Sequence, residues 1–333
     1  MKTKPSHPSS FILHPLLSHL WLQEPDAETT ARAVVELGLP LADPSTTLRE
    51  ASLWDRASPA DLASAYTDVF LLNVYPYGTA FTDPSGELNG PEAQRVAALY
   101  EVHGYRPPEL KSVGAPDHLG LCLGFLAAGQ DGLLPHLAGW APVCCLAVER
   151  EPSAHSFYRA LASTTRQHLF VMLSEAKPPG AETPSALPSV AGQALRFAQD
   201  DGDNLQSEIY NLQSEDEVRL RHIVRFFLTP ALCGVFLSRS RLGQMAKELG
   251  GRLPFGSRFE VAEMLFTYAG GGVEQLGQLL NALETEVAAW ATAYRGWAEK
   301  HPAWRPVAEM WLARTAEAAR QLSAMRQMAA AAP

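Results

Sequence analysis

Residues 117–126 read Asp-His-Leu-Gly-Leu-Cys-Leu-Gly-Phe-Leu, a segment that is almost wholly apolar after its first two residues. Its apolar positions 119, 122, 123 and 126 are spaced i, i+3, i+4 and i+7, which is the spacing of one face of an α-helix. Asp117 is of a residue type that caps helix N-termini, and the glycines at 120 and 124 let another helix approach closely. We therefore expect a buried core helix here, with Asp117 as its N-cap.

The segments on both sides carry the same helical period. One apolar pattern runs from Pro91, a residue favoured in the first turn, to Gly104, a residue favoured just past the end. In residues 276–294, large apolar side chains recur three and four positions apart, as they do in helix bundles. His301-Pro302 interrupts this pattern, and a last helix over 304–325 is expected to fold back antiparallel on its predecessor.

The composition also favours helices. Ala and Leu supply 94 of the 333 residues, whereas Ile supplies three, so helix formers outnumber the β-branched residues that suit sheets. The predicted fold class is all-α, with a helical bundle followed by a second, smaller helical domain.

The chain divides at a segment rich in turn-forming residues. Pro, Gly and Ser make up eight of the sixteen residues 177–192, and the unit Asn-Leu-Gln-Ser-Glu at 204–208 is repeated at 211–215. We expect a flexible linker there. The predicted organisation is a disordered segment at 1–19, a helical domain at 20–176, a linker at 177–215 and a C-terminal helical domain at 216–333.

Charge and motif content exclude several functional classes. The net charge of -9, from 27 basic and 36 acidic residues, disfavours nucleic-acid binding and suits a basic partner. The sequence has no phosphate-binding loop, dinucleotide fingerprint, HExxH or GxSxG, so we expect no catalytic residue, no metal site and no resident cofactor. The four cysteines form no CxxC pair and have apolar neighbours, which indicates buried, reduced thiols.

The N-terminal apolar stretch is too interrupted for an export signal or a membrane span. His14, Pro15, Ser18 and His19 lie within residues 11–22, and no uninterrupted apolar run reaches about 18 residues. We expect a cytoplasmic protein without stable membrane insertion, present as a monomer or a homodimer.

Four motifs follow one another between residues 66 and 140. They are YTDVFL at 66–71, YPYGTAF at 75–81, PDHL at 116–119 and HLAGW at 136–140. In this order they resemble the TorD/DmsD/NarJ family of dedicated chaperones for molybdenum-cofactor oxidoreductases, over residues 20–175. The resemblance implies an all-α domain that binds the N-terminal leader and the apo form of a client's catalytic subunit and assists its cofactor insertion, without catalysis.

The resemblance also implies a site. In that family the Asp-His pair and the aromatic loop are linked to leader binding, which corresponds to Tyr75, Tyr77, Phe81, Asp117 and His118 in this sequence. The residue types suit the task, because aromatic rings anchor a peptide and a carboxylate accepts bidentate contacts from leader arginines. Each residue also has a structural interpretation: Asp117 as a helix cap, His118 as a packed neutral histidine, and most other aromatic residues as core.

A local basic excess lies in the C-terminal part. Residues 216–260 carry eight basic and four acidic side chains, in which Arg219, Arg221, Arg239 and Arg241 form a candidate secondary docking surface. A solvated helix face explains such a patch, and so does docking of an acidic client surface or a transient contact with GTP or molybdopterin dinucleotide. Two further alternatives stay open: a nucleotide-binding, GTPase-like cofactor-insertion factor, and a helical regulator of nucleic acid.

Overall fold

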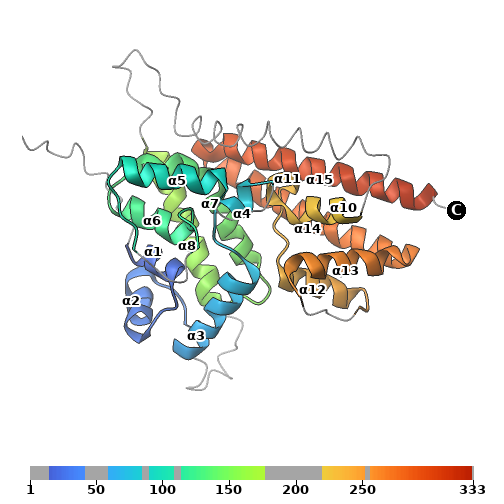
Figure 1. Cartoon of the computed structure of the whole chain (residues 1–333), viewed down its shortest axis with the longest axis horizontal. Helices are drawn as coiled ribbons and strands as arrows, with labels where there is room; N and C mark the ends of the chain where they lie inside the picture. Colours follow the sequence, from blue (N-terminus) through green and yellow to red (C-terminus); the bar gives the residue numbers. More distant parts are fainter. Residues whose placement is uncertain are drawn as a thin grey trace, which may run out of the picture.

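The computed structural model describes residues 15–41, 59–84, 90–108, 114–176, 220–251 and 256–331. Within these ranges every named element of secondary structure is a helix, so the predicted all-α fold class is confirmed (Figure 1). The predicted linker at 177–215 lies outside the described residues. The helices before it are α1 (Pro15–Leu22), α2 (Ala27–Leu37), α3 (Pro59–Tyr66), the π-helix η1 (Thr67–Asn73), α4 (Thr79–Thr82), α5 (Pro91–Val102), α6 (Leu119–Ala127), the 3-10 helix η2 (Asp131–Leu133), α7 (Leu134–Arg150) and α8 (Ser156–Glu175).

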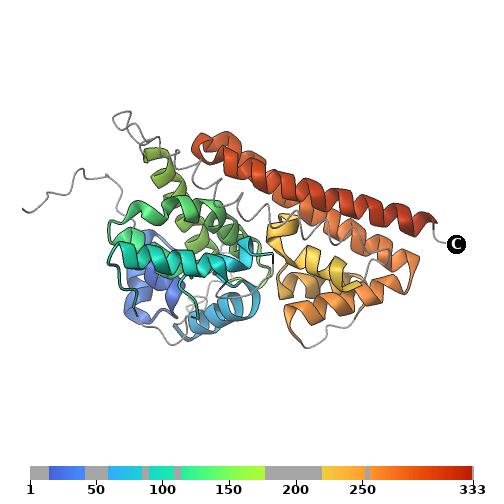
Figure 2. The same ribbon diagram turned by 45° about the horizontal axis from the view of Figure 1, so that its top comes forward.

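The C-terminal part consists of further helices. They are α10 (Leu220–Leu228), α11 (Pro230–Cys233), α12 (Arg239–Glu248), α13 (Arg258–Gly270), α14 (Val273–Lys300), the 3-10 helix η3 (Pro302–Trp304) and α15 (Arg305–Ala331). The long helices α14 and α15 run side by side and antiparallel, as the break at residues 301–302 predicts (Figures 1 and 2). Arg326, near the end of α15, accordingly contacts Asn281 and Glu284 of the first half of α14.

The segment 117–126 forms the buried helix α6, as its apolar spacing predicts. Its closest neighbour is α1: the Ser18 hydroxyl donates to the Gly120 carbonyl at 2.7 Å, and a Cβ on Gly120 would lie 2.6 Å from Leu22. The expected close approach at this glycine is confirmed. The disorder expected over residues 15–19 is wrong, because Leu16 and Leu17 of α1 bury their side chains in this contact and thereby order the segment.

The helix α7 contacts the C-terminal part of the chain near a proline inside the helix. Pro142 has no backbone N–H, so the carbonyl of Ala138, four residues earlier, loses its helical partner. The indole N–H of Trp304 donates to that carbonyl at 2.7 Å, and the indole of Trp311 donates to the neighbouring carbonyl of Gly139 at 2.9 Å. The 3-10 helix η3 and the start of α15 are therefore held on α7 by one buried hydrogen bond each.

Ionic and polar contacts add to this junction. Glu286 of α14 accepts from Arg150 of α7 at 2.9 Å and from Arg241 of α12 at 2.6 Å. The Asn73 side chain, at the end of η1, accepts from the backbone N–H of Ser240 at 2.9 Å. Buried apolar side chains of both parts belong to one contiguous cluster. The two-domain organisation stays a prediction.

One helical stretch, residues 131–150, is long and apolar enough to cross a membrane by length and composition alone. The protein buries 83% of its most apolar window. Its composition is therefore accounted for by its place in the core, where it packs against α8 and the start of α15.

Candidate functional site

The loop at residues 75–78 forms backbone hydrogen bonds with the turn at residues 117–119, about 40 positions later in the sequence. The Leu119 N–H donates to the Pro76 carbonyl at 2.7 Å, and the Gly78 N–H donates to the Asp117 carbonyl at 3.1 Å. Tyr77 and His118 thus form an isolated antiparallel bridge. Two of the four sequence motifs therefore lie against each other, and Gly78 brings in a third, because a Cβ there would lie 3.1 Å from the Trp140 ring.

The Asp117 side chain is fully buried, and it forms a hydrogen bond with the segment after the loop rather than capping α6. Its Oδ2 accepts from the Thr79 backbone N–H at 2.7 Å, at the start of α4. The predicted N-cap role on α6 is wrong, because His118 takes it: its Nδ1 accepts from the Gly120 N–H at 3.1 Å. Asp117 Oδ1 and the Thr79 hydroxyl have no hydrogen-bond partner. Burial raises the pKa of Asp117, although the Thr79 N–H opposes the shift.

His118 is a packed neutral residue. Burial lowers the pKa of its imidazole to about 3, and its Nδ1 already accepts a hydrogen bond, so the proton lies on Nε2. Its ring meets that of Tyr77 edge to face, with centroids 4.9 Å apart. The Tyr77 hydroxyl accepts from the Gly114 N–H at 3.2 Å, so this half-buried ring ties the loop to the chain before α6.

Phe81 lies inside an aromatic stack. Its ring packs between Trp140 of α7, at 6.1 Å, and Phe236 of the C-terminal part, at 5.2 Å, and it is fully buried. The guanidinium of Arg258 covers the outer face of Phe236 at 4.5 Å. Phe81 therefore has a packing role in this structure, and a direct contact with a leader would require the stack to open.

Tyr75 and Tyr77 are the two predicted site residues with surface exposure. A tight turn across Pro76, in which the Tyr77 N–H donates to the Tyr75 carbonyl at 2.9 Å, fixes their relative position. Tyr75 also lies within electrostatic range of Arg258. The structure therefore assigns the two tyrosines to the surface of the site and assigns Asp117, His118 and Phe81 to its support.

A buried ionic network lies behind the loop. The His136 Nδ1 contacts Glu92 of α5 at 2.5 Å, while its Nε2 accepts from the Trp140 indole at 3.0 Å. Burial disfavours the ionised form of Glu92, but His136 and Arg95 outweigh it, so the pKa of this carboxyl is lowered. His136 is thus the satisfied core histidine that the sequence favours, and its network fixes the Trp140 ring.

Several residues of this site had no signal in the sequence. The contact of Thr79, inside YPYGTAF, with Asp117 and the contacts of Phe236 and Arg258 with this region join distant segments, which no local pattern reveals. Asn73 lies two residues after YTDVFL, at the end of η1, which closes with the π-type hydrogen bond from the Val74 N–H to the Val69 carbonyl.

The structure separates the arginines of the predicted secondary docking surface. Arg219 lies outside the described residues. Arg221 pairs with Glu263 at 3.2 Å and Arg241 with Glu286, so their charges are compensated. Arg239 donates through Nε to the Gly256 carbonyl at 3.0 Å and has no acidic partner among the described residues.

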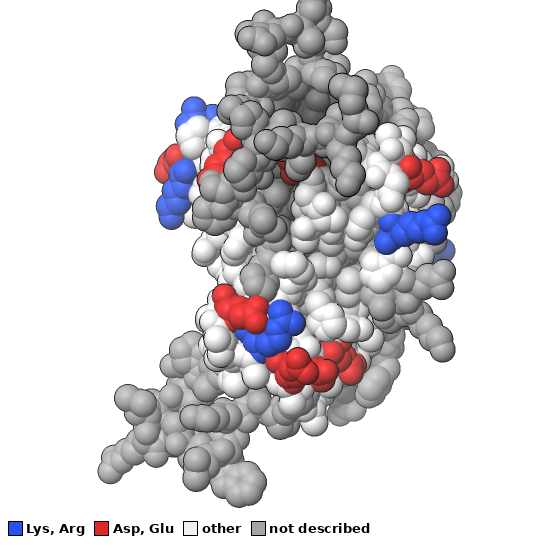
Figure 3. Space-filling model, turned by 90° about the vertical axis from the view of Figure 1, so that its left-hand side faces the viewer, with Lys and Arg blue, Asp and Glu red and all other residues white. Residues whose placement is uncertain are grey.

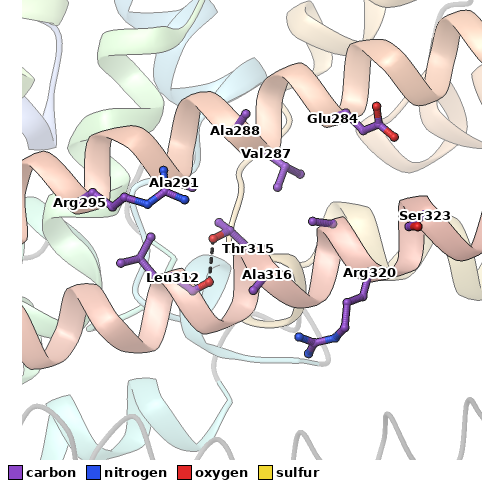
Figure 4. Close-up of a pocket in the computed structure, with 11 residues that line it drawn as sticks. Glu284, Val287, Ala288, Ala291, Arg295, Leu312, Thr315, Ala316, Arg320 and Ser323 are labelled. Atoms are coloured by element: carbon purple, nitrogen blue, oxygen red, sulfur yellow. Dashed lines mark hydrogen bonds between the residues drawn. The ribbon is translucent and has the colours of Figure 1, made fainter.

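A groove of about 730 Å³ lies elsewhere, between α14 and α15 (Figure 4). Its floor is formed by small and apolar side chains of both helices, and it contains none of the predicted site residues. The residues that line it are Glu284, Val287, Ala288, Ala291, Arg295, Leu312, Thr315, Ala316, Ala319, Arg320 and Ser323. Across the described part of the chain, no group of three or more His, Cys, Asp or Glu side chains could hold a metal.

Comparisons with known proteins connect this site to one family. Residues 35–146, about a third of the chain, match the family model of the nitrate reductase delta subunit, a family of molybdoenzyme maturation chaperones. No curated protein and no solved structure matches the chain. The matched segment includes η1, the loop at 75–81, the turn at 116–119 and the start of α7, so the motif residues that meet at this site lie within the part of the chain that is similar to the nitrate reductase delta subunit family, whereas Phe236 and Arg258 lie outside it.

Proposed function

We propose that this protein is a cytoplasmic chaperone that binds the apo catalytic subunit of a molybdenum or tungsten oxidoreductase and its N-terminal leader. It holds this client until the cofactor is inserted, by binding and release rather than by catalysis. One observation carries the proposal: three of the four motifs in the segment similar to the chaperone family meet at one loop, through the pairing of residues 75–78 with 117–119 and the contact of Gly78 with Trp140.

The geometry supports peptide binding at this loop. Tyr75 and Tyr77 have surface exposure, and hydrogen bonds at both ends of the loop fix their backbone. A rigid loop with amphipathic rings loses little conformational entropy on binding, which favours peptide recognition. Asp117 and His118 contribute by holding this surface in place, and a leader that displaced the loop would reach their polar atoms.

Electrostatics has a secondary part in this proposal. The net charge of -9 favours encounter with a basic leader. On the face formed by α1, α2, α5 and α6, the charged side chains are few and of both signs (Figure 3). We therefore assign recognition of the leader to Tyr75 and Tyr77 at the loop rather than to the charged side chains described on that face.

Release follows from the client's own folding. A chaperone that prefers the cofactor-free state loses affinity when the client folds over its cofactor, because the recognised surface is then buried. Equal affinity for cofactor-free and cofactor-loaded client would contradict this step.

The experiment is an affinity pull-down from the native cytosol, with bound proteins identified by mass spectrometry. The wild type and Tyr77→Ala are compared with the control Tyr268→Ala, a substitution of a more exposed tyrosine on α13. We expect one molybdoenzyme catalytic subunit with the wild type and the control, and little with Tyr77→Ala. Absence of any oxidoreductase from the wild-type sample would reject the chaperone function, while equal recovery with Tyr77→Ala would move the site away from the loop.

A further inference from the structure

Two arginines of the C-terminal part lie near the loop and form no ion pair with a carboxylate of the described residues. Arg258, the first residue of α13, donates to the Leu228 carbonyl at the end of α10, and Arg239, the first residue of α12, donates to the Gly256 carbonyl. Neither has an acidic partner among the described residues. The neighbouring cations Arg150 and Arg241, in contrast, share Glu286.

Both arginines lie beside the loop. The backbone N–H of Ser240, next to Arg239, donates to Asn73 at 2.9 Å, two residues before Tyr75. Arg258 lies over Phe236, whose other face packs on Phe81, and within electrostatic range of Tyr75. The segment from Asn73 to Phe81 thus contacts the motif residues on one side and, on the other, the C-terminal segments that carry Arg239 and Arg258.

This arrangement costs stability in the absence of a ligand. A positive charge at the first residue of a helix opposes the helix dipole, and both arginines have this position. The Nε of Arg258 is buried without a hydrogen-bond partner, and burial lowers the pKa of its guanidinium to about 10, so it still carries its charge at neutral pH. An anion docked beside these arginines would offset the unfavourable helix-dipole interactions and part of the desolvation of the Arg258 guanidinium.

We propose that Arg239, Arg258 and Tyr75 form a docking surface for an acidic segment of the client polypeptide. The inference rests on the proposed chaperone function and adds the chemistry of one client segment. Guanidinium groups bind carboxylates in a bidentate manner, and the Tyr75 hydroxyl adds a donor. Because these cations repel arginines, the segment that docks here is distinct from a basic leader.

The first test uses a peptide probe, since the client sequence is unknown. A fluorescein-labelled peptide of alternating glutamate and serine is titrated with the full chain at low salt, and its anisotropy is compared with that of a lysine-serine peptide. We expect the glutamate peptide alone to bind. Arg239→Gln and Arg258→Gln should each weaken this binding by about threefold or more, because each removes one charged contact.

The matched control is Arg305→Gln. Arg305 is an exposed arginine at the start of α15 that also donates only to a backbone carbonyl, that of Ala298, among the described residues. This variant should bind the glutamate peptide like the wild type. If Arg258→Gln loses its helical circular dichroism, Arg239→Gln decides. Equal binding by Arg239→Gln and the wild type, or no binding of the glutamate peptide, would overturn the proposal, and so would tighter binding of pyrophosphate than of this peptide, which marks a phosphate site.

A second test separates this inference from the proposed function. In the cytosolic pull-down at low salt, Arg239→Gln should recover the client catalytic subunit in reduced amount, and its difference from the wild type should shrink with added salt in the washes, because salt screens the contact that the substitution removes. Recovery equal to the wild type would overturn the acidic docking surface and leave the chaperone function standing. Failure of the wild type to recover any catalytic subunit would reject the chaperone function itself, while the peptide titration would still decide whether the surface binds carboxylates.

Discussion

The rings of Phe81 and Phe236 stack with their centroids 5.2 Å apart and their planes 25° from parallel. This contact joins the loop within the family-matched segment to the C-terminal part, which that match does not reach. Because Phe81 also packs on Trp140, the stack connects the C-terminal part to both the loop and α7. The C-terminal helices are thus a structural component of the candidate site.

The first prediction concerns this stack. Phe236→Ala removes a ring that is 5% exposed, and it should lower the free energy of unfolding by about 3 kcal/mol, because the cavity left behind cannot close fully. The control is Phe259→Ala on α13, whose ring is 37% exposed and which should cost less than about 1 kcal/mol. Urea denaturation measures both, and equal losses would mean that the stack is not tightly packed.

The second prediction uses two glycines near Trp140. A Cβ on Gly78 would lie 3.1 Å from the Trp140 indole, which cannot move without losing its hydrogen bond to His136. Gly78→Ala should therefore cost about 1–3 kcal/mol by overpacking and reduce client recovery. A Cβ on Gly139, in the middle of α7, would meet no other group within 4 Å, so Gly139→Ala should be neutral or add up to about 1 kcal/mol. Thermal unfolding compares them, and a loss from both substitutions would contradict the described packing at Gly139.

The sequence predicted those parts of the fold that depend on local patterns. The apolar period places α6 and α14, and Pro91 and Gly104 bracket α5 within about one turn of its observed ends. The sequence offers two serines, Ser238 and Ser240, as caps for α12, and the structure uses Ser238, whose hydroxyl accepts from the backbone N–H of Arg241. These features could be predicted because helix caps and the helical period depend on residues only a few positions apart.

What the sequence could not predict depends on distant partners. Asp117 is of a residue type that favours the N-cap of α6, yet its carboxylate accepts a hydrogen bond from the backbone N–H of Thr79, 38 residues earlier in the sequence. Phe81 looks like an exposed loop ring, yet Phe236 covers it. Both differences arise from packing between segments, which overrides the preferences of a residue's immediate neighbours.

The third prediction concerns the carboxylate between two arginines. Glu286 has 7% of its surface exposed, so Glu286→Gln leaves Arg150 and Arg241 without their shared anion in a partly buried place. The free energy of unfolding should fall by about 2–3 kcal/mol. The matched control is Glu284→Gln two residues earlier, which breaks an exposed pair with Arg326 and should cost at most about 1 kcal/mol. Urea denaturation at neutral pH measures both losses, and a difference below the error of that measurement would show that Glu286 does not join the two parts.

The fourth prediction concerns the pH dependence of stability at Asp117. Burial raises the pKa of this carboxyl above its ordinary value of 3.8, so the folded state holds the proton more tightly than the unfolded state does. The stability that this proton confers is complete below the unfolded pKa and is lost as the pH rises through the folded pKa. In Asp117→Asn an amide oxygen still accepts from Thr79 and no ionisation occurs. Asp117→Asn should therefore gain stability relative to the wild type as the pH rises.

Asp26 provides a control of opposite sign. It caps α2 at the surface, and the N–H of Thr29 lowers the pKa of its carboxyl, so its contribution is present above the unfolded pKa and is lost as the pH falls. Urea denaturation between about pH 3 and pH 7 compares each variant with the wild type, so that the contributions of all other groups cancel. Asp26→Asn should lose stability relative to the wild type as the pH rises. If Asp117→Asn also lost stability relative to the wild type as the pH rises, the folded state would stabilise the ionised Asp117 carboxylate. Its Oδ1 would then accept a hydrogen bond.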